Sequence, residues 1–400
     1  MTSKLSLKFL LVLLLAAVGV LVYSLIPRAI ELKVSDDGNF LFYNNPVALK
    51  YDNGFIVAYL TSRGKVKLDI WSDENKVKSH TIHNFRDQID RKRGWADDHA
   101  APAIFHDENR HVLYLATAYH GTNLFIYEYS LKSGEIKQIL VAKGRYTYPR
   151  FFKGNQENIG LLVRQQPEVG LRGDLIMRSS SDGFMSESIV VPSEEGTVVY
   201  AGTPVSNEKS LYFSYSVHHY SENRLIGFQL VKFDLESKEL VESCDISSNL
   251  RSDYISNRPT GLGLDDGYLM VGSALTYTSD SGLESVESSG KGKGQRGIEL
   301  QSVLLVRGRV EDCNSFDVVF EKSQVNKPYY HTSVAINNSG NYLFFDDDNV
   351  MTNWSHRNCF RNEKMMYPNF IEDSVVLYAS KNEEYSIRNF NSSLYACIRQ

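Results

Sequence analysis

Short strand-like runs separated by turn residues recur along almost the whole 400-residue chain, and they constrain its fold more than any other feature. From residue 30 onward scarcely any segment has the spacing of an amphipathic helix. Turns such as Asp52-Asn53-Gly54 and Asp265-Asp266-Gly267 lie between the runs. This pattern predicts an all-β sandwich, barrel or propeller. The clearest runs are Phe55–Leu60, Val112–Ala118, Leu124–Tyr129, Ile159–Val163, Leu211–Tyr215, Leu225–Phe233, Tyr268–Val271, Leu300–Val306 and Tyr342–Phe345.

Three segments, 55–76, 112–135 and 211–239, repeat one plan and favour the propeller among these folds. Each has a strand, a turn, and a second strand with aromatic residues at every other position before a charged turn. Repeats of about fifty residues are typical of propeller blades, and residues 30–400 have room for about seven. We therefore predict one domain, a seven-bladed β-propeller over 30–400. Residues 278–297 are rich in Ser, Gly and charge, which predicts a mobile insertion between strands.

The charge balance limits the classes of partner. The net charge is −5, so the chain lacks the basic footprint of a nucleic-acid-binding protein. Aromatic residues make up 12% of the chain, a composition that suits strands and sugar-binding surfaces. The sequence has no P-loop, dinucleotide-binding glycine motif, nucleophile elbow or zincin motif. We expect a monomer that binds no nucleic acid.

The first 29 residues form a separate segment that sets the compartment. Phe9–Ile26 is an apolar run preceded by Lys4 and Lys8. Its length reaches the lower end of a membrane span, and the two lysines favour a cytoplasmic N-terminus. A cleaved signal peptide, cut after Ser24, and an uncleaved signal anchor both fit. The missing A-x-A site favours the anchor. The propeller is then held at the inner membrane facing the periplasm or exterior, or is secreted.

The expected export of the domain makes its four cysteines candidates for disulfides. An exported domain allows Cys244, Cys313, Cys359 and Cys397 to pair, with three possible connectivities.

Polar and charged residues stand at the ends of consecutive strands in the first half of the domain. Asp97-Asp98-His99 precedes a strand, and His120 follows the next strand twenty-one residues later. Tyr148 begins a third strand within Thr147-Tyr148-Pro149, and Arg164 follows the apolar run that comes after it. Because the innermost strands of consecutive blades line one central funnel, we expect His99, His120, Tyr148 and Arg164 to converge there.

These motifs resemble the BNR-repeat family of seven-bladed propellers, which includes polysaccharide lyases of the ulvan-lyase type. The resemblance covers residues 90–220, and the remainder matches only in strand rhythm. It implies β-elimination at a uronic acid of an acidic polysaccharide, with no cofactor required for the chemistry. Carried over by position, the predicted catalytic residues are His99, His120, Tyr148 and Arg164, and the predicted substrate-binding residues are Tyr200, His218 and Asp98.

The residue types suit the implied reaction. Proton removal beside a carboxylate requires that its charge be neutralised, which Arg164 can do with a bidentate pair. A histidine, His99 or His120, acts as the base near neutral pH. Tyr148 exchanges a proton with the base side or the leaving oxygen, and its neighbours Arg164 and a charged histidine would lower its pKa. Asp97 or Asp98 would fix the orientation of a histidine.

Two other functions stay open. Ala100 and Ala101 follow the Asp-Asp-His motif where the family commonly has a polar residue, often Asn. That difference leaves room for a non-catalytic glycan-binding propeller. A propeller-fold glycoside hydrolase is a third reading, although the adjacent carboxylates of Asp97 and Asp98 would point apart on a strand.

Structural metal sites are weaker predictions. The acidic run Asp346-Asp347-Asp348-Asn349 offers oxygen ligands for Ca²⁺. It lacks the rest of a known Ca²⁺-binding loop, so an acidic turn is the preferred interpretation. His331, His356 and Cys359 offer ligands for Zn²⁺ without a complete set.

Overall fold

The structure is a computed structural model that describes most of the domain. It covers residues 29–40, 47–72, 74–89, 100, 102–119, 121–167, 170–221, 224–250, 254–277, 300–325, 333–346, 349–354, 359–360, 365–371, 375–381 and 391–399. The apolar segment Phe9–Ile26, the insertion 278–297, and Asp98, His99 and His120 lie outside these residues. None of the helices within the described ranges is long and apolar enough to cross a membrane.

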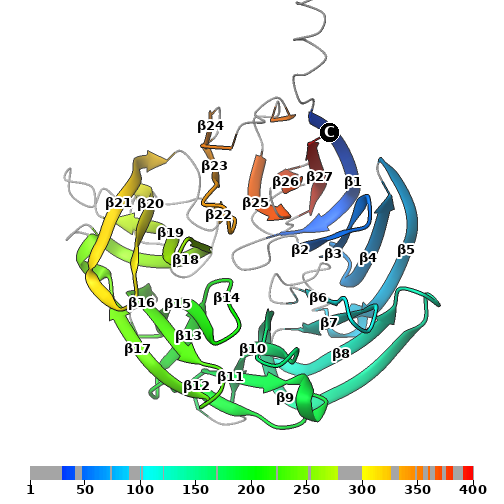
Figure 1. The fold of residues 1–400 in the computed structure, drawn as a ribbon, viewed down its shortest axis with the longest axis horizontal. Helices are drawn as coiled ribbons and strands as arrows, with labels where there is room; N and C mark the ends of the chain where they lie inside the picture. The colour runs from blue at the N-terminus through cyan, green and yellow to red at the C-terminus, as the bar shows by residue number, and fades with distance from the viewer. Residues whose placement is uncertain are drawn as a thin grey trace, which may run out of the picture.

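The described strands form six antiparallel sheets arranged in a ring (Figure 1). The first sheet contains β2 (Val47–Tyr51), β3 (Gly54–Leu60), β4 (Lys65–Ser72) and β5 (Asn75–Asn84). The second sheet contains β6 (Ala103–Asp107), β7 (Val112–Ala118), β8 (Thr122–Ser130), β9 (Ile136–Lys153), β10 (Ile159–Gln166), β11 (Asp174–Ser179) and β12 (Ser188–Val191). The third contains β13 (Thr197–Ala201), β14 (Val205–Ser206), β15 (Ser210–His219), β16 (Arg224–Asp234) and β17 (Glu239–Asp245), and the fourth contains β18 (Tyr254–Asp265), β19 (Tyr268–Tyr277), β20 (Leu300–Arg309) and β21 (Asp312–Val325). The last two are β22 (Val334–Ile336), β23 (Tyr342–Asp346) and β24 (Asn349–Thr352); and β25 (Met365–Ile371), β26 (Val375–Lys381), β27 (Asn391–Arg399) and β1 (Ala29–Asn39).

The two ends of the described chain close the ring. β1 pairs with β27 from Ala29 opposite Arg399 to Asn39 opposite Asn391. The first strand of the domain thus becomes the outermost strand of the last sheet, beside the C-terminal strand (Figure 1). This pairing closes the ring, because it places the first strand of the domain in the same sheet as the last strand.

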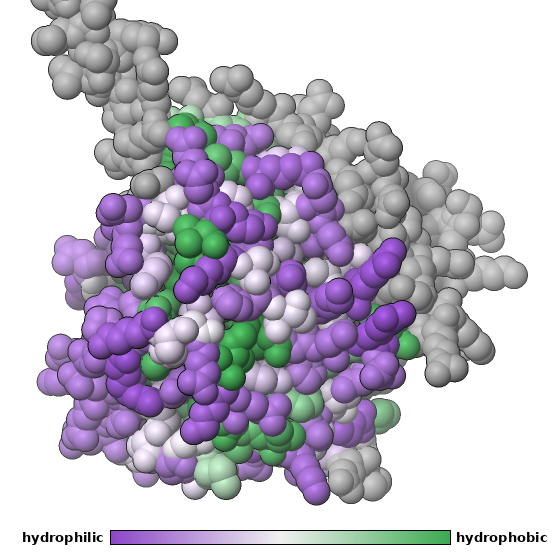
Figure 2. Space-filling view, turned by 90° about the vertical axis from the view of Figure 1, so that its right-hand side faces the viewer, coloured by the Kyte–Doolittle hydropathy of each residue, from purple (hydrophilic) through white to green (hydrophobic). Residues whose placement is uncertain are grey.

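Each sheet is buried on both faces because it packs between two neighbours. In β3, Ile56 and Leu60 pack toward β7 and β8, while Phe55 and Val57 pack toward β26 and β27. Successive side chains point to opposite faces of a strand, so both sets become core. This double burial explains why the middle strands read as continuous apolar runs. The outer strand β5 is mostly exposed, and Figure 2 shows this side of the molecule as largely hydrophilic with small apolar groups.

The three repeated segments of the sequence occupy equivalent places in the ring. Segment 55–76 forms β3 and β4, segment 112–135 forms β7 and β8, and segment 211–239 forms β15 and β16. In all three cases these are the middle strands of their sheet. The prediction of an all-β fold is confirmed, and the nine apolar runs all lie within strands.

The structure settles the cysteine pairing and corrects the zinc prediction. Cys244 of β17 is bonded to Cys313 of β21, and Cys359 is bonded to Cys397 of β27. The prediction of Cys359 as a zinc ligand is wrong, because a disulfide sulfur has no thiolate to offer the metal. Its suggested partners His331 and His356 lie outside the described residues. Within the described part of the chain, no three His, Cys, Asp or Glu side chains are grouped to hold a metal.

The acidic run lies in a hairpin. Asp346 ends β23 and pairs with Asn349 at the start of β24, so the run connects these two strands. Asp347 and Asp348 lie outside the described residues.

Candidate functional site

Arg164 is a buried cation near the end of β10. Its backbone lies opposite Thr147 of β9 and Leu175 of β11, and only 3% of the residue is exposed. Its side chain is on the same face of β10 as Leu162, which packs toward β13 and β15. Strand alternation therefore directs the guanidinium into the junction between two neighbouring sheets.

Two tyrosine rings enclose this guanidinium. Arg164 Cζ lies 5.0 Å from the ring centre of Tyr148 and 4.5 Å from that of Tyr200. The two ring centres are 5.8 Å apart. Cations are attracted to aromatic faces at such distances, more strongly where water is excluded. We call Arg164 with Tyr148 and Tyr200 the arginine cage.

The cage leaves part of the guanidinium without a partner. Among the described residues, no group accepts a hydrogen bond from Arg164 Nε or Nη1, and no carboxylate pairs with the side chain. Burial opposes the charge, but interactions with Tyr200 and Tyr148 outweigh it and raise the pKa of Arg164. The group is therefore a desolvated cation with free donors, which an anionic ligand would complete.

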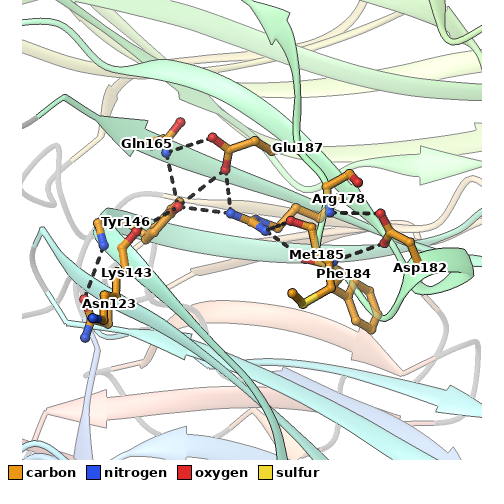
Figure 3. Close-up of polar contacts among 11 residues, drawn as sticks. Asn123, Lys143, Tyr146, Gln165, Arg178, Asp182, Phe184, Met185 and Glu187 are labelled. Atoms are coloured by element: carbon orange, nitrogen blue, oxygen red, sulfur yellow. Dashed lines mark hydrogen bonds and ion pairs between the residues drawn. The ribbon is translucent and has the colours of Figure 1, made fainter.

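The opposite face of the same sheet holds a second buried arginine, and both of its terminal nitrogens have hydrogen-bond acceptors. Arg178 of β11 donates to Glu187 at 2.5 Å, to the Tyr146 hydroxyl at 3.0 Å, and to the carbonyls of Phe184 and Met185 at 2.7 and 3.0 Å (Figure 3). The turn that supplies these carbonyls is the Ser179–Phe184 segment, in which Asp182 accepts from Met185 N. Arg178 thus has an evident structural role, whereas Arg164 has none.

The backbone at Tyr148 has an unusual conformation. Its φ is +56°, a left-handed value that costs energy for an aromatic residue. The pairing of β9 with β10 shifts register at this point, between Leu162 and Arg164. The irregularity reverses the alternation of β9, so that Tyr146 faces Arg178 while Tyr148, two residues later, faces Arg164. The left-handed backbone at Tyr148 therefore brings its ring to the buried guanidinium of Arg164.

His218 and Tyr220 extend the cage toward the surface. The His218 ring centre lies 6.1 Å from that of Tyr200 and 5.0 Å from that of Tyr220, both with edge-on geometry. Tyr220 is 41% exposed, and burial raises its pKa while Arg164 opposes that shift. The aromatic groups therefore form a path from the exposed Tyr220 to the buried Arg164.

Three residues of this region were missed from the sequence: Tyr220, Gln166 and Arg145. The Gln166 side chain and the charge of Arg145 both oppose the rise in the pKa of Tyr220 that burial causes. The available signal was strand alternation, because Tyr220 is two residues after His218 and Gln166 is two after Arg164. Arg145 carried no comparable signal, because only the pairing of β9 with β10 places it opposite Gln166.

The structure brings together four of the predicted site residues: Tyr148, Arg164, Tyr200 and His218. Asp98, His99 and His120 lie outside the described residues. The neighbour of His120 is informative, because a Cβ atom on Gly121 would lie 3.4 Å from Arg145 Nε and 3.6 Å from Gln166 Oε1. Gly121 therefore lies at the outer end of the same cluster.

Ala100, which differs from the resembled family, is completely buried. It belongs to the apolar cluster that contains Phe85 and Tyr119. A side chain in this position contacts the core, so the absence of a polar residue here does not by itself remove a contact from the surface of the site.

A pocket elsewhere does not compete with this cluster. Its volume is about 230 Å³, and it lies where β2 connects to β3 and β4 to β5. Arg164 lies at the opposite end of its sheet, near the connection from β10 to β11. The pocket includes no residue of the arginine cage, and its Tyr129 has no exposed surface. We therefore place the candidate site at Arg164.

The ring of sheets has the propeller fold of two solved polysaccharide lyases, one of them an ulvan lyase. One such structure, an ulvan lyase solved free and bound to a saccharide of glucuronic acid and sulfated rhamnose, has a TM-score of 0.65 and 12% identity, over 92% of this chain and 95% of that one. The polysaccharide lyase Uly1 has a TM-score of 0.54 and 10% identity, over 94% of this chain and all of the other. No family model and no curated protein sequence matches the chain.

Proposed function

We propose that the protein is a polysaccharide lyase that cleaves an acidic, uronate-containing polysaccharide by β-elimination. The observation that carries this proposal is the buried guanidinium of Arg164, held between aromatic rings without an anion among the described residues. The fold shared with ulvan-lyase-type enzymes supports the reaction class. We also infer seven blades, because β9 completes one four-stranded blade with β6–β8 and begins another with β10–β12.

The reaction makes a specific demand on a cation. In β-elimination a base takes the proton from C5 of the uronate, the electron pair forms the C4–C5 double bond, and the C4–O4 bond breaks. Negative charge develops on the carboxylate as the proton leaves. A preorganised guanidinium in a site without water stabilises that charge strongly. Arg164, with free Nε and Nη1 donors, has the group and the surroundings for this role.

The neighbours of Arg164 supply groups for proton transfer. In the proposed mechanism Tyr148 takes the proton from the substrate or gives one to the leaving oxygen. Tyr200 and His218 hold the sugar beside Arg164. His99 and His120 keep their predicted role as base and carboxylate-side groups. The position of Gly121 beside Gln166 and Arg145 supports a place for His120 at this site. A tyrosine fixed by a strained backbone beside a cation is typical of a functional position.

Export is part of the proposal. The two disulfides of the domain favour an oxidising compartment. With the apolar segment Phe9–Ile26 as an uncleaved anchor, the propeller would face the periplasm or exterior, where large polysaccharides are found.

The decisive experiment measures the ultraviolet absorbance of the unsaturated uronate that β-elimination creates. The full-length protein is incubated with a panel of uronate polysaccharides that includes ulvan, beside the variants Arg164→Lys and Tyr148→Phe. Arg110→Lys is the matched control, because Arg110 is an exposed arginine paired with Glu128 away from the site. We expect absorbance to rise with wild type and control, and to be lost in both site variants.

Other outcomes distinguish the remaining functions. New reducing ends without the absorbance would identify a glycoside hydrolase. Saturable binding of a polysaccharide with no cleavage would identify a glycan-binding propeller. Equal activity in wild type and Arg164→Lys would contradict the role given to the arginine cage.

A further inference from the structure

We propose that Arg145, together with Gln166 and Tyr220, forms a second anion-binding position that reads an acidic group on the sugar next to the one held by Arg164. This inference rests on the proposed function and extends it. It assigns to the outer end of the site a preference for substrates in which consecutive sugars carry negative charge.

The backbone places the two arginines on one face of the sheet. Arg145 of β9 pairs with Gln166 of β10, and Thr147 of β9 pairs with Arg164 of β10. Arg164 therefore lies two residues before Gln166 on β10. Residues two apart on a strand share a face, so Gln166 and Arg164 point to the same side. Arg145, opposite Gln166, lies next in line toward the end of the strand.

One hydrogen bond to another described residue holds the Arg145 side chain. Its Nη1 donates to the carbonyl of Pro167 at 3.3 Å, and its Nε lies against Gly121. Gly121 has a φ of +67°, and a Cβ atom there would meet Arg145 Nε at 3.4 Å. No described carboxylate pairs with Arg145. A guanidinium fixed by one carbonyl, with its remaining donors open, is arranged to bind an external anion.

Tyr220 connects the two arginines. Burial raises the pKa of its hydroxyl, and the side chains of Arg164, Gln166 and Arg145 all oppose that shift. Since Tyr220 is 41% exposed, it stands between the buried cation and the exposed one. A saccharide lying along this path would place one sugar in the arginine cage and the next beside Arg145.

The different exposure of the two arginines predicts different effects. Arg164 is desolvated and acts on charge that develops in the reaction, so it affects kcat. Arg145 is exposed and binds charge that is present in substrate and transition state alike, so it affects KM. Contacts with exposed charges are screened by salt, which gives the second position a distinct signature.

The test compares wild type with Arg145→Gln and Arg145→Lys on ulvan and on chemically desulfated ulvan, at low and high salt. Arg110→Gln is the control for loss of one exposed arginine. We expect Arg145→Gln to raise KM about five- to tenfold at low salt with kcat changed less than about twofold, as removal of an exposed charge contact implies. The difference should shrink at high salt, and Arg145→Lys should recover part of it.

The two substrates identify the anion. If the effect of Arg145→Gln disappears on desulfated ulvan, the second group is the sulfate of the neighbouring sugar. If it persists, the anion is not on that sugar and this inference is overturned. A wild-type enzyme that cleaves ulvan, with Arg145→Gln matching it in KM on both polymers, overturns this inference and leaves the proposed function intact.

A wild type that cleaves nothing overturns the proposed function instead. Binding of ulvan measured by calorimetry then decides the role of Arg145. Weaker binding by Arg145→Gln than by Arg110→Gln supports the anion contact, and equal affinities or no binding by wild type overturn it.

Discussion

At the scale of single residues, the partners of a buried arginine decide what it can do. Arg178 and Arg164 lie on neighbouring strands of one sheet, and each is at least 95% buried. Arg178 is surrounded by a carboxylate, a hydroxyl and two carbonyls, so its charge is compensated within the fold. Arg164 lies against aromatic faces, and none of the described residues accepts a hydrogen bond from its Nε or Nη1. The first arrangement stabilises the fold, while the second retains a cost that only a ligand would offset.

Replacement of Arg164 with methionine should separate activity from stability. Removal of an uncompensated buried charge should leave the free energy of unfolding unchanged or raise it by about 1 kcal/mol. Lyase activity should fall at least about 100-fold, as for other groups that stabilise developing charge. Denaturant unfolding and the absorbance assay measure the two effects. A large loss of stability in Arg164→Met would show that the arginine is structural.

Arg178→Met is the complementary variant and should behave in the opposite way. It leaves the carbonyls of Phe184 and Met185 and the carboxylate of Glu187 without their donor. Because Glu187 is 40% exposed, we discount the full penalty and expect a loss of about 2 to 4 kcal/mol. Denaturant unfolding measures it. An unchanged midpoint would mean that solvent replaces Arg178 readily.

At the scale of elements, the junction between β5 and β8 contains a titratable contact. His83 of β5 lies 2.6 Å through Nδ1 from the hydroxyl of Tyr127 on β8, and its ring centre is 4.3 Å from that of Phe125. Burial lowers the pKa of His83 below its usual 6.5 and raises the pKa of Tyr127 to about 12. The native junction therefore favours neutral His83 and neutral Tyr127.

This junction should make stability depend on pH. The unfolded chain takes up a proton on His83 as pH falls below 6.5, whereas the folded protein resists it. The contribution is thus complete above pH 6.5 and is lost as pH falls toward the lowered native pKa. We expect His83→Gln to flatten the fall in unfolding free energy between pH 7.5 and pH 5, measured with urea. His111→Asn, at an exposed turn position with a φ of +53°, should leave the slope as in wild type.

At the scale of the whole molecule, covalent links join parts that the hydrogen-bonded sheets leave separate. The Cys244–Cys313 bond connects β17 and β21, the outer strands of two neighbouring sheets, across 69 residues of sequence. The second bond ties Cys359 to β27, next to the β1 strand that closes the ring. The first bond restrains two neighbouring sheets, and the second ties a residue outside the strands to the last sheet.

Loss of the Cys244–Cys313 bond should destabilise the domain without changing its fold. We expect the Cys244→Ala, Cys313→Ala double variant to lose about 2 to 4 kcal/mol, as is typical for a bond that closes a loop of this length. A lower Tm with unchanged circular dichroism would be the observation. Wild type treated with a reductant should move toward the variant, and a variant as stable as the oxidised wild type would contradict the expectation.

Much of the fold was predictable because strand patterns are local. The runs from Phe55–Leu60 to Tyr342–Phe345 all became strands, and the repeats found the middle strands of three sheets. The arrangement of the site was harder to predict from the sequence. Tyr148 and Arg164 were expected to converge and do so, but the left-handed backbone that aims Tyr148 has no sequence signature in a non-glycine residue. Arg145 gains its neighbours only from the pairing of β9 with β10.

The sequence by itself determined the all-β class, the strand positions and the residue types available for chemistry, because hydrophobic alternation and turn residues act over a few positions. Only the tertiary structure decided which cysteines pair, which strands lie beside β9, and which groups surround each buried arginine. Those outcomes depend on contacts between residues far apart in the chain. Arg164 and Arg178 look alike in the sequence, and they differ because one face of their sheet offers Arg178 the carboxylate of Glu187, while the other face offers Arg164 two tyrosine rings.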